Sequence, residues 1–194
     1  MSNITNPALH MEALYAKSQA YIAKGLRAKA AGDLDEYQLW GSLALELLAK
    51  SSLSSIHPAL VADPTHYQSL FAACGHQISP DIKTITAKTL FPRLGHVSRR
   101  FDLRVQVFCE QLSLRRNSEI HSGESPFSGM KAESWEKRYW HAVEIILELQ
   151  TKSLEQWLGA EDAKAPQRIL SDAKAAIQMA VQTRITHVRE DFES

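Results

Sequence analysis

Side chains suited to acid–base chemistry gather in the stretch LSLRRNSEIHSGESPF, residues 112–127. Arg116 and His121 lie five residues apart there, which separates them by about 140° around an ideal helix. A histidine can donate or accept a proton near neutral pH, and an arginine can bind two phosphate oxygens through its planar guanidinium. The pair is therefore suited to proton transfer at a phosphate group.

The position of this pair in its helix supports the same chemistry. Asn117 precedes His121 by four residues, so the two share a helix face. We expect Gly123 to take the left-handed conformation just past the helix, which leaves His121 in the last turn, where the carbonyl end favours an imidazolium. We also expect Arg116 and His121 to lie at an exposed helix end and to contribute little to stability.

Positive charge is concentrated just before the pair. The whole chain balances 22 basic against 22 acidic residues, which gives no overall signal for binding DNA or a membrane. From Lys83 to Arg116, however, the sequence contains eight basic residues and only two acidic ones, Asp102 and Glu110. Such a surplus suits an anionic polymer or a phosphorylated ligand. An ordinary solvated face, in particular at Arg99 and Arg100, is the alternative.

The spacing of apolar residues is helical along almost the whole chain, and no alternating strand pattern is present. A first helix is predicted from Asn6-Pro7 to about Ala31, and Asp33 is placed to cap the second. The second helix is apolar on more than one face, which predicts a central position in a bundle. Further helices are expected from Pro64 to about Ile78, from Ser79-Pro80 to Phe91-Pro92, from Ser98 to His121, from Trp135 to Leu158, and from Pro166 onwards.

These elements predict an all-α chain with a bundle over residues 1–160 and a C-terminal helical extension over 161–194, packed on the same domain. The two cysteines, Cys74 and Cys109, are expected to be buried thiols in a reducing compartment. The first residues, MSNITNPALHMEAL, show no signal-peptide pattern, and the densest apolar run, 39–49, is too short for a membrane span. We therefore expect a cytoplasmic protein without membrane contact.

The run Arg116-Asn117-Ser118-Glu119-Ile120-His121, at the end of a long helix, resembles the R-N-x-x-x-H signature of HEPN domains (higher eukaryotes and prokaryotes nucleotide-binding). The resemblance covers residues 7–158, and residues 165–194 do not match the family. It implies a HEPN-like helical bundle with an additional C-terminal helix. It also implies a homodimer whose two-fold axis brings two motifs together.

The resemblance further implies a metal-independent endoribonuclease of a toxin–antitoxin, abortive-infection or antiviral system. The ribose 2′-OH of RNA would attack the adjacent phosphate, with His121 as general acid or base and Arg116 stabilising the transition state. Asn117 would orient His121 or a phosphate oxygen. The implied partners are RNA, a second copy and an antitoxin or defence protein. No cofactor is expected, and no sequence pattern for metal ligands is present.

Five further residues are candidates for binding RNA or for supporting the motif: Arg115, Glu119, Glu46, Arg99 and Arg100. Glu46 lies among leucines, and a buried carboxylate needs a partner. That partner is either an arginine of the active cleft or Lys50, four residues further on. Glu119 is either a surface residue or an acid that orients Arg115 or Arg116 of a second copy.

Two classes of function stay open at this point. The first is an endoribonuclease, and the second is a non-catalytic module that binds a nucleotide or forms a helical dimer within a larger complex. The complete Arg-Asn-x-x-x-His pattern favours the first. A third interpretation assigns no function to Arg116 and His121: the helix end is simply solvated, and the arginine pairs with a nearby carboxylate. The aromatic cluster of Trp135, Tyr139 and Trp140 is expected in the core or at a dimer interface.

Overall fold

The computed structural model describes the backbone of residues 6–193 and the side chains of residues 6–186. The first five residues of the expected N-terminal segment, and Ser194 of the extension, lie outside the described residues. The described chain is all-α, as predicted, and its only bridge of β type joins Ala62 to Thr84. The helices are α1 Met11–Ala30, α2 Leu34–Ile56, η1 Pro58–Leu60, α3 Tyr67–Ala73, α4 Ala87–Val97, α5 Leu103–His121, η2 Ala132–Ser134, α6 Glu136–Glu148, α7 Leu154–Leu158 and α8 Ala160–Glu193.

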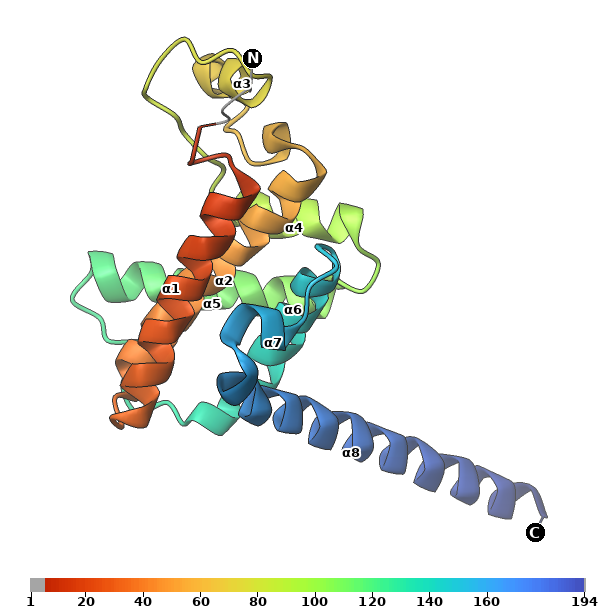
Figure 1. Ribbon diagram of the computed structural model, residues 1–194. Coiled ribbons are helices and arrows are strands. Elements are labelled where there is room, and N and C mark those ends of the chain that lie inside the picture. The colour runs from red at the N-terminus through yellow and green to blue at the C-terminus, as the bar shows by residue number, and fades with distance from the viewer. Residues whose placement is uncertain (1–5, 194) are drawn as a thin grey trace.

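Helices α1 and α2 form an antiparallel hairpin (Figure 1). Asp33 caps α2 as predicted, because its carboxylate accepts the N–H of Glu36 at 2.9 Å. The predicted start of the first helix at Asn6-Pro7 is wrong. The side chain of Asn6 accepts the N–H of Ala8 at 2.9 Å and closes a separate turn, and α1 begins only at Met11.

Helix α2 is the central element of the bundle, as its apolar faces predict. It packs against α1, α4, α5 and α6, which surround it in Figure 1. Leu45, Leu48 and Leu53 are at most 1% exposed. Each such side chain stabilises the fold by roughly 1.5–3 kcal/mol relative to an exposed position. The polar residues of α2 that approach α5 are therefore held by a rigid scaffold.

The predicted helix from Ser79-Pro80 to Phe91-Pro92 is wrong. The chain is extended near Thr84, where the N–H of Ile85 donates to Val61 at 2.9 Å. This pairing satisfies backbone groups that a helix would otherwise satisfy. Helix α4 begins afterwards and continues through Pro92, whose missing N–H costs one helical bond. Burial of the flanking Phe91 and Leu94 offsets that cost. The helix predicted from Pro64 to about Ile78 is also shorter than expected, because the observed helix, α3, covers only Tyr67–Ala73.

Helix α5 carries the motif and begins at Leu103, later than the predicted Ser98. The Asp102 carboxylate caps it by accepting two backbone N–H groups, at 2.9 and 3.0 Å. The predicted apolar stripe is confirmed, since Phe101, Val105, Phe108 and Leu112 are buried.

The end of α5 differs from the prediction. The helix ends at His121, and Ser122 is extended, with φ −131°. Gly123 does not take the predicted left-handed conformation, which Gly129 adopts instead, with φ +73°. The buried ring of Phe127 anchors the loop between them to the core.

The single long helix predicted from Trp135 to Leu158 is wrong, because two helices occupy this stretch. The chain leaves α6 after Glu148, and Thr151 takes a left-handed φ of 55°. Ser153 and Gln156 then cap α7 reciprocally. The side chains of Trp135, Tyr139 and Trp140 are at most 1% exposed, so this cluster belongs to the core and cannot supply a dimer interface.

The extension forms α8, which starts at Ala160 rather than at the predicted Pro166. Its first part packs on the bundle through Ala163 and Leu170, which are buried. From residue 174 to residue 186 every side chain is exposed, and the helix points away from the bundle in Figure 1. No helix among the described residues is long and apolar enough to cross a membrane.

The two cysteines have different environments. Cys109 on α5 is fully buried, as predicted, and burial raises the pKa of its thiol. The prediction for Cys74 is wrong, because this thiol is exposed just after α3. Both thiols are free.

Candidate functional site

The first element of the candidate site is an ion-pair cluster between α2 and α5. The Nη2 atom of Arg116 donates to one carboxylate oxygen of Glu46, and the Nζ atom of Lys50 lies 3.0 Å from the other. Both partners considered for Glu46, an arginine and Lys50, therefore bind it at the same time. These three side chains, which we call the Glu46 cluster, are only 11–14% exposed. One carboxylate is shared by two largely buried cations.

The Glu46 cluster extends towards the start of α4. Lys50 also donates to the hydroxyl of Thr84, at 3.1 Å, and thereby connects α2 to the extended segment before α4. The Nε atom of Arg116 is buried and has no hydrogen-bond partner among the described residues. The protein therefore encloses this N–H without satisfying it.

A cavity of about 890 Å³ opens beside the cluster, between α2, α4 and α5. Its polar lining combines cations, carboxylates, hydroxyls and an amide, and its apolar lining comes from the extended segment, α4 and α5. The lining residues are Glu46, Lys50, Thr84, Ile85, Thr86, Ala87, Lys88, Pro92, Glu110, Ser113, Leu114, Arg116 and Asn117. Arg116 and Asn117 of the motif therefore meet residues of α2 and α4 in one cavity, which we call the α4–α5 cavity.

His121 lies outside this cavity. It is exposed in the last residue of α5, and its side chain makes no hydrogen bond or ion pair within the described chain. No hydrogen bond joins it to Asn117. The expected exposed helix end is thus correct for His121 and wrong for Arg116. A single chain does not bring the histidine and the arginine into one enclosed site.

The neighbours of the motif have separate surroundings. Arg115 directs its Nη1 atom to the sulfur of Met130, at 3.5 Å, and so contacts the loop that follows α5. Glu119 is half-buried, and its Oε2 atom is buried without a hydrogen-bond partner in the described structure. Neither residue joins the Glu46 cluster.

Arg99 and Arg100 lie at the opposite end of α5 from His121. Helix α5 has 19 residues, which is about 28 Å of helix axis. Arg100 pairs with Glu144 and Glu148 of α6. Arg99 and Arg100 are therefore remote from His121, at the other end of the same helix.

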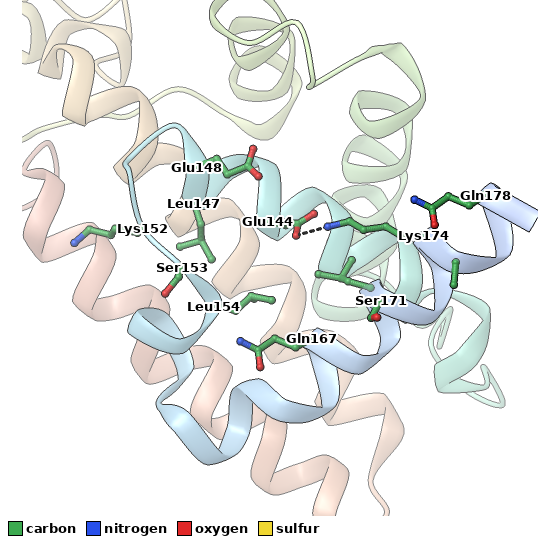
Figure 2. Close-up of a pocket in the computed structure, with 12 residues that line it drawn as sticks. Glu144, Leu147, Glu148, Lys152, Ser153, Leu154, Gln167, Ser171, Lys174 and Gln178 are labelled. Atoms are coloured by element: carbon green, nitrogen blue, oxygen red, sulfur yellow. Dashed lines mark hydrogen bonds and ion pairs between the residues drawn. The ribbon is translucent and has the colours of Figure 1, made fainter.

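A second cavity, of about 560 Å³, lies between α6, α7 and α8. Figure 2 shows Lys174 of α8 directed towards Glu144 of α6, and their charged atoms are 2.9 Å apart. Arg100 approaches the same carboxylate at 3.9 Å. The charged groups here connect α8 to the bundle, and the motif contributes nothing to this cavity.

The contribution of Thr84, Thr86 and Lys88 to the cavity does not follow from the predicted helices. Thr86-Ala87-Lys88 carries a helix-start signal, because threonine is a favoured residue just before a helix. The signal was obscured by the predicted helix from Ser79-Pro80, which would have placed these residues in a helix interior. The sequence predicts Lys50 only as a partner for Glu46.

Comparisons with known proteins identify no relative. No protein-family model matches the chain, and neither a curated protein nor a solved structure matches it significantly. Among the described residues, no group of three or more His, Cys, Asp or Glu side chains is placed to hold a metal ion. The candidate site is therefore defined by its own geometry.

Proposed function

We propose that the chain is a metal-independent endoribonuclease of HEPN type, acting as a homodimer in a toxin–antitoxin or antiviral-defence system. The proposal rests on one observation, the different environments of the two motif residues, Arg116 and His121. Glu46 holds Arg116 in place at the wall of a cavity, whereas His121 is exposed and unengaged at the end of the same helix. A fixed cation and a free proton-transfer group, combined from two copies of the chain, suit phosphodiester cleavage.

In the proposed reaction, the 2′-oxygen of a ribose attacks the adjacent phosphorus, and the bond from phosphorus to the 5′-oxygen breaks. His121 of one copy takes the proton of the 2′-OH, and His121 of a second copy gives a proton to the departing 5′-oxygen. The products are a 2′,3′-cyclic phosphate and a 5′-OH. Arg116 stabilises the charge on the phosphoryl oxygens. The need for a 2′-OH selects RNA over DNA.

Glu46 is a positioning residue in this scheme. Its carboxylate fixes one edge of the Arg116 guanidinium and leaves the buried Nε donor unpaired. Asn117 lines the same cavity and is placed to contact a phosphate oxygen rather than His121. The exposed His121 needs a second copy to enclose it.

A non-catalytic module that binds a nucleotide, or that dimerises within a larger complex, is the second candidate. It is favoured by one observation, which is that the cavity containing Arg116 and Asn117 does not include His121. A ligand could then bind at the arginine without any contact to the histidine.

Cleavage of a labelled RNA in the presence of EDTA separates the two candidates. We expect the wild-type chain to yield cyclic-phosphate ends, and His121→Ala and Arg116→Ala to yield none. His141→Ala is the matched control, since His141 is also an exposed helical histidine, on α6. Cleavage by His121→Ala at the rate of His141→Ala would rule out His121 as the catalytic group, and binding of RNA by the wild type without cleavage would leave the binding module.

A further inference from the structure

The α4–α5 cavity has more positive than negative charge on its walls. Lys50, Lys88 and Arg116 line it together with only two carboxylates, those of Glu46 and Glu110. Glu110 accepts a hydrogen bond from Gln106, at 3.0 Å. Glu46 alone faces two cations, Lys50 and Arg116, both largely buried.

This imbalance has an energetic consequence. A carboxylate can neutralise only one unit of charge, so the Glu46 cluster retains one positive charge in a poorly hydrated position. A partly buried charge without a counter-charge is unfavourable. An anion in the cavity would restore neutrality.

The first turn of α4 supplies donors on another wall of the same cavity. Thr86 precedes the helix, and its hydroxyl makes no capping bond. The first N–H groups of a helix have no partner within the helix, and the helix dipole favours an anion there. Ala87 and Lys88, the first two residues of α4, both line the cavity. Lys88 makes no ion pair with the described residues.

We infer that the α4–α5 cavity binds a phosphate group between the first turn of α4, with Lys88, and the Glu46 cluster, with Arg116. The cavity volume, about 890 Å³, lies in the usual range for small-molecule sites and accommodates a nucleotide. Ile85, Pro92 and Leu114 form apolar walls for its uncharged part. The phosphate belongs either to a free nucleotide-sized molecule or to an RNA strand. The inference shares Arg116 and Asn117 with the proposed function and does not involve His121.

Binding of 5′-AMP, measured by isothermal calorimetry and by thermal shift, tests the inference, with adenosine as the phosphate-free probe. We expect 5′-AMP to bind and to raise the melting temperature, and adenosine to do neither. Lys88→Ala should weaken binding about tenfold, the loss of one charge-assisted contact. Lys83→Ala is the matched control, because Lys83 is an exposed lysine that does not line the cavity.

A 2′-O-methyl oligoribonucleotide, which cannot be cleaved through a 2′-OH, identifies the source of the phosphate. Displacement of 5′-AMP by this oligonucleotide, in wild type but not in Lys88→Ala, assigns the cavity to an RNA strand. Binding of 5′-AMP without such displacement assigns it to a small molecule. Equal binding of AMP by the Lys88→Ala and Lys83→Ala variants, or no binding by the wild type, overturns the inference.

The His121→Ala variant distinguishes failure of this inference from failure of the proposed nuclease. Because His121 does not line the cavity, this variant should bind 5′-AMP as the wild type does while losing RNA cleavage. Binding with no cleavage in the wild type would leave the inference intact and remove the nuclease. Cleavage without binding of any phosphate probe would remove the inference and leave the nuclease.

Discussion

Arg116 and Glu46 pair across the contact between α5 and α2, seventy residues apart in sequence. Lys50 occupies the other oxygen of the same carboxylate, so the pair is part of a charged cluster inside the bundle. The motif arginine thus has a structural partner before any ligand arrives. Its effects on stability and on ligand binding must be separated by experiment.

The first prediction concerns the stability contributed by Arg116. The Arg116→Ala variant should lower the free energy of unfolding by about 1–3 kcal/mol, because it removes the partner of a largely buried Glu46 oxygen. The His121→Ala variant should change it by less than about 0.5 kcal/mol, since His121 is exposed and unpaired. Urea denaturation measures both. Equal stability of the two variants would show that the Arg116–Glu46 pair does not form.

The second prediction concerns thiol reactivity. The exposed thiol of Cys74 should react at once with an aromatic disulfide reagent in the native protein. Cys109 should not react until the chain is unfolded, because it is buried and burial raises the pKa of its thiol. Absorbance should report one thiol per chain natively and two in guanidinium. Two fast thiols in the native protein would contradict the burial of α5 against the core.

The third prediction follows from the sign of that pKa shift. A thiol whose pKa is raised in the folded state stabilises the fold fully below its ordinary pKa of about 8.5. This contribution is lost as the pH rises above that value, where the unfolded thiol ionises. The free energy of unfolding should therefore decline between about pH 8.5 and 10, and the Cys109→Ala variant should decline less steeply. Parallel curves for the two proteins would refute this assignment.

The sequence predicts well what local periodicity and capping determine. The buried stripe of α5, the Asp33 cap and the central position of α2 follow directly from residue spacing. Pairing between residues that are far apart in the sequence is harder to predict. The bridge from Ala62 to Thr84 displaced a predicted helix, and no local pattern announces a contact between residues so far apart.

In the candidate site, too, residue types and spacing can be read from the sequence, whereas tertiary contacts cannot. Arg116, Asn117 and Glu46 could be selected by residue type and spacing, and one of the two expected partners for Glu46 was an arginine. The inward direction of Arg116 depends on how α5 rotates against α2. The role of Lys88 depends on where α4 begins. Both are set by tertiary packing, which overrides local propensity.

The fourth prediction concerns α8. A chain ending at Gln178 should unfold with a free energy within about 0.5 kcal/mol of the full chain, because the removed side chains described by the structure are exposed. A chain ending at Gln167 should lose about 2 kcal/mol or more, since it lacks the buried Leu170 and the Lys174–Glu144 pair. Denaturant unfolding checks both. Strong destabilisation by the shorter deletion would mean that the outer half of α8 is covered in solution.

The last prediction concerns assembly. Cleavage by the proposed scheme needs an acid and a base, and one chain offers a single motif histidine, so we expect a homodimer of about 43 kDa, twice the 21.7 kDa of the chain. The buried tryptophans cannot form its interface. Val107, Leu114 and His121 instead recur every seven residues along one face of α5, and Val107 and Leu114 are 40% and 65% exposed. Light scattering at micromolar concentration should therefore show a dimer that Val107→Asp, which lies outside the α4–α5 cavity, converts to a monomer without RNA cleavage. Ile177→Asp, at an exposed position on α8, should leave the dimer intact. A fully active monomer would refute the composite site, and dissociation by Ile177→Asp alone would place the interface on α8.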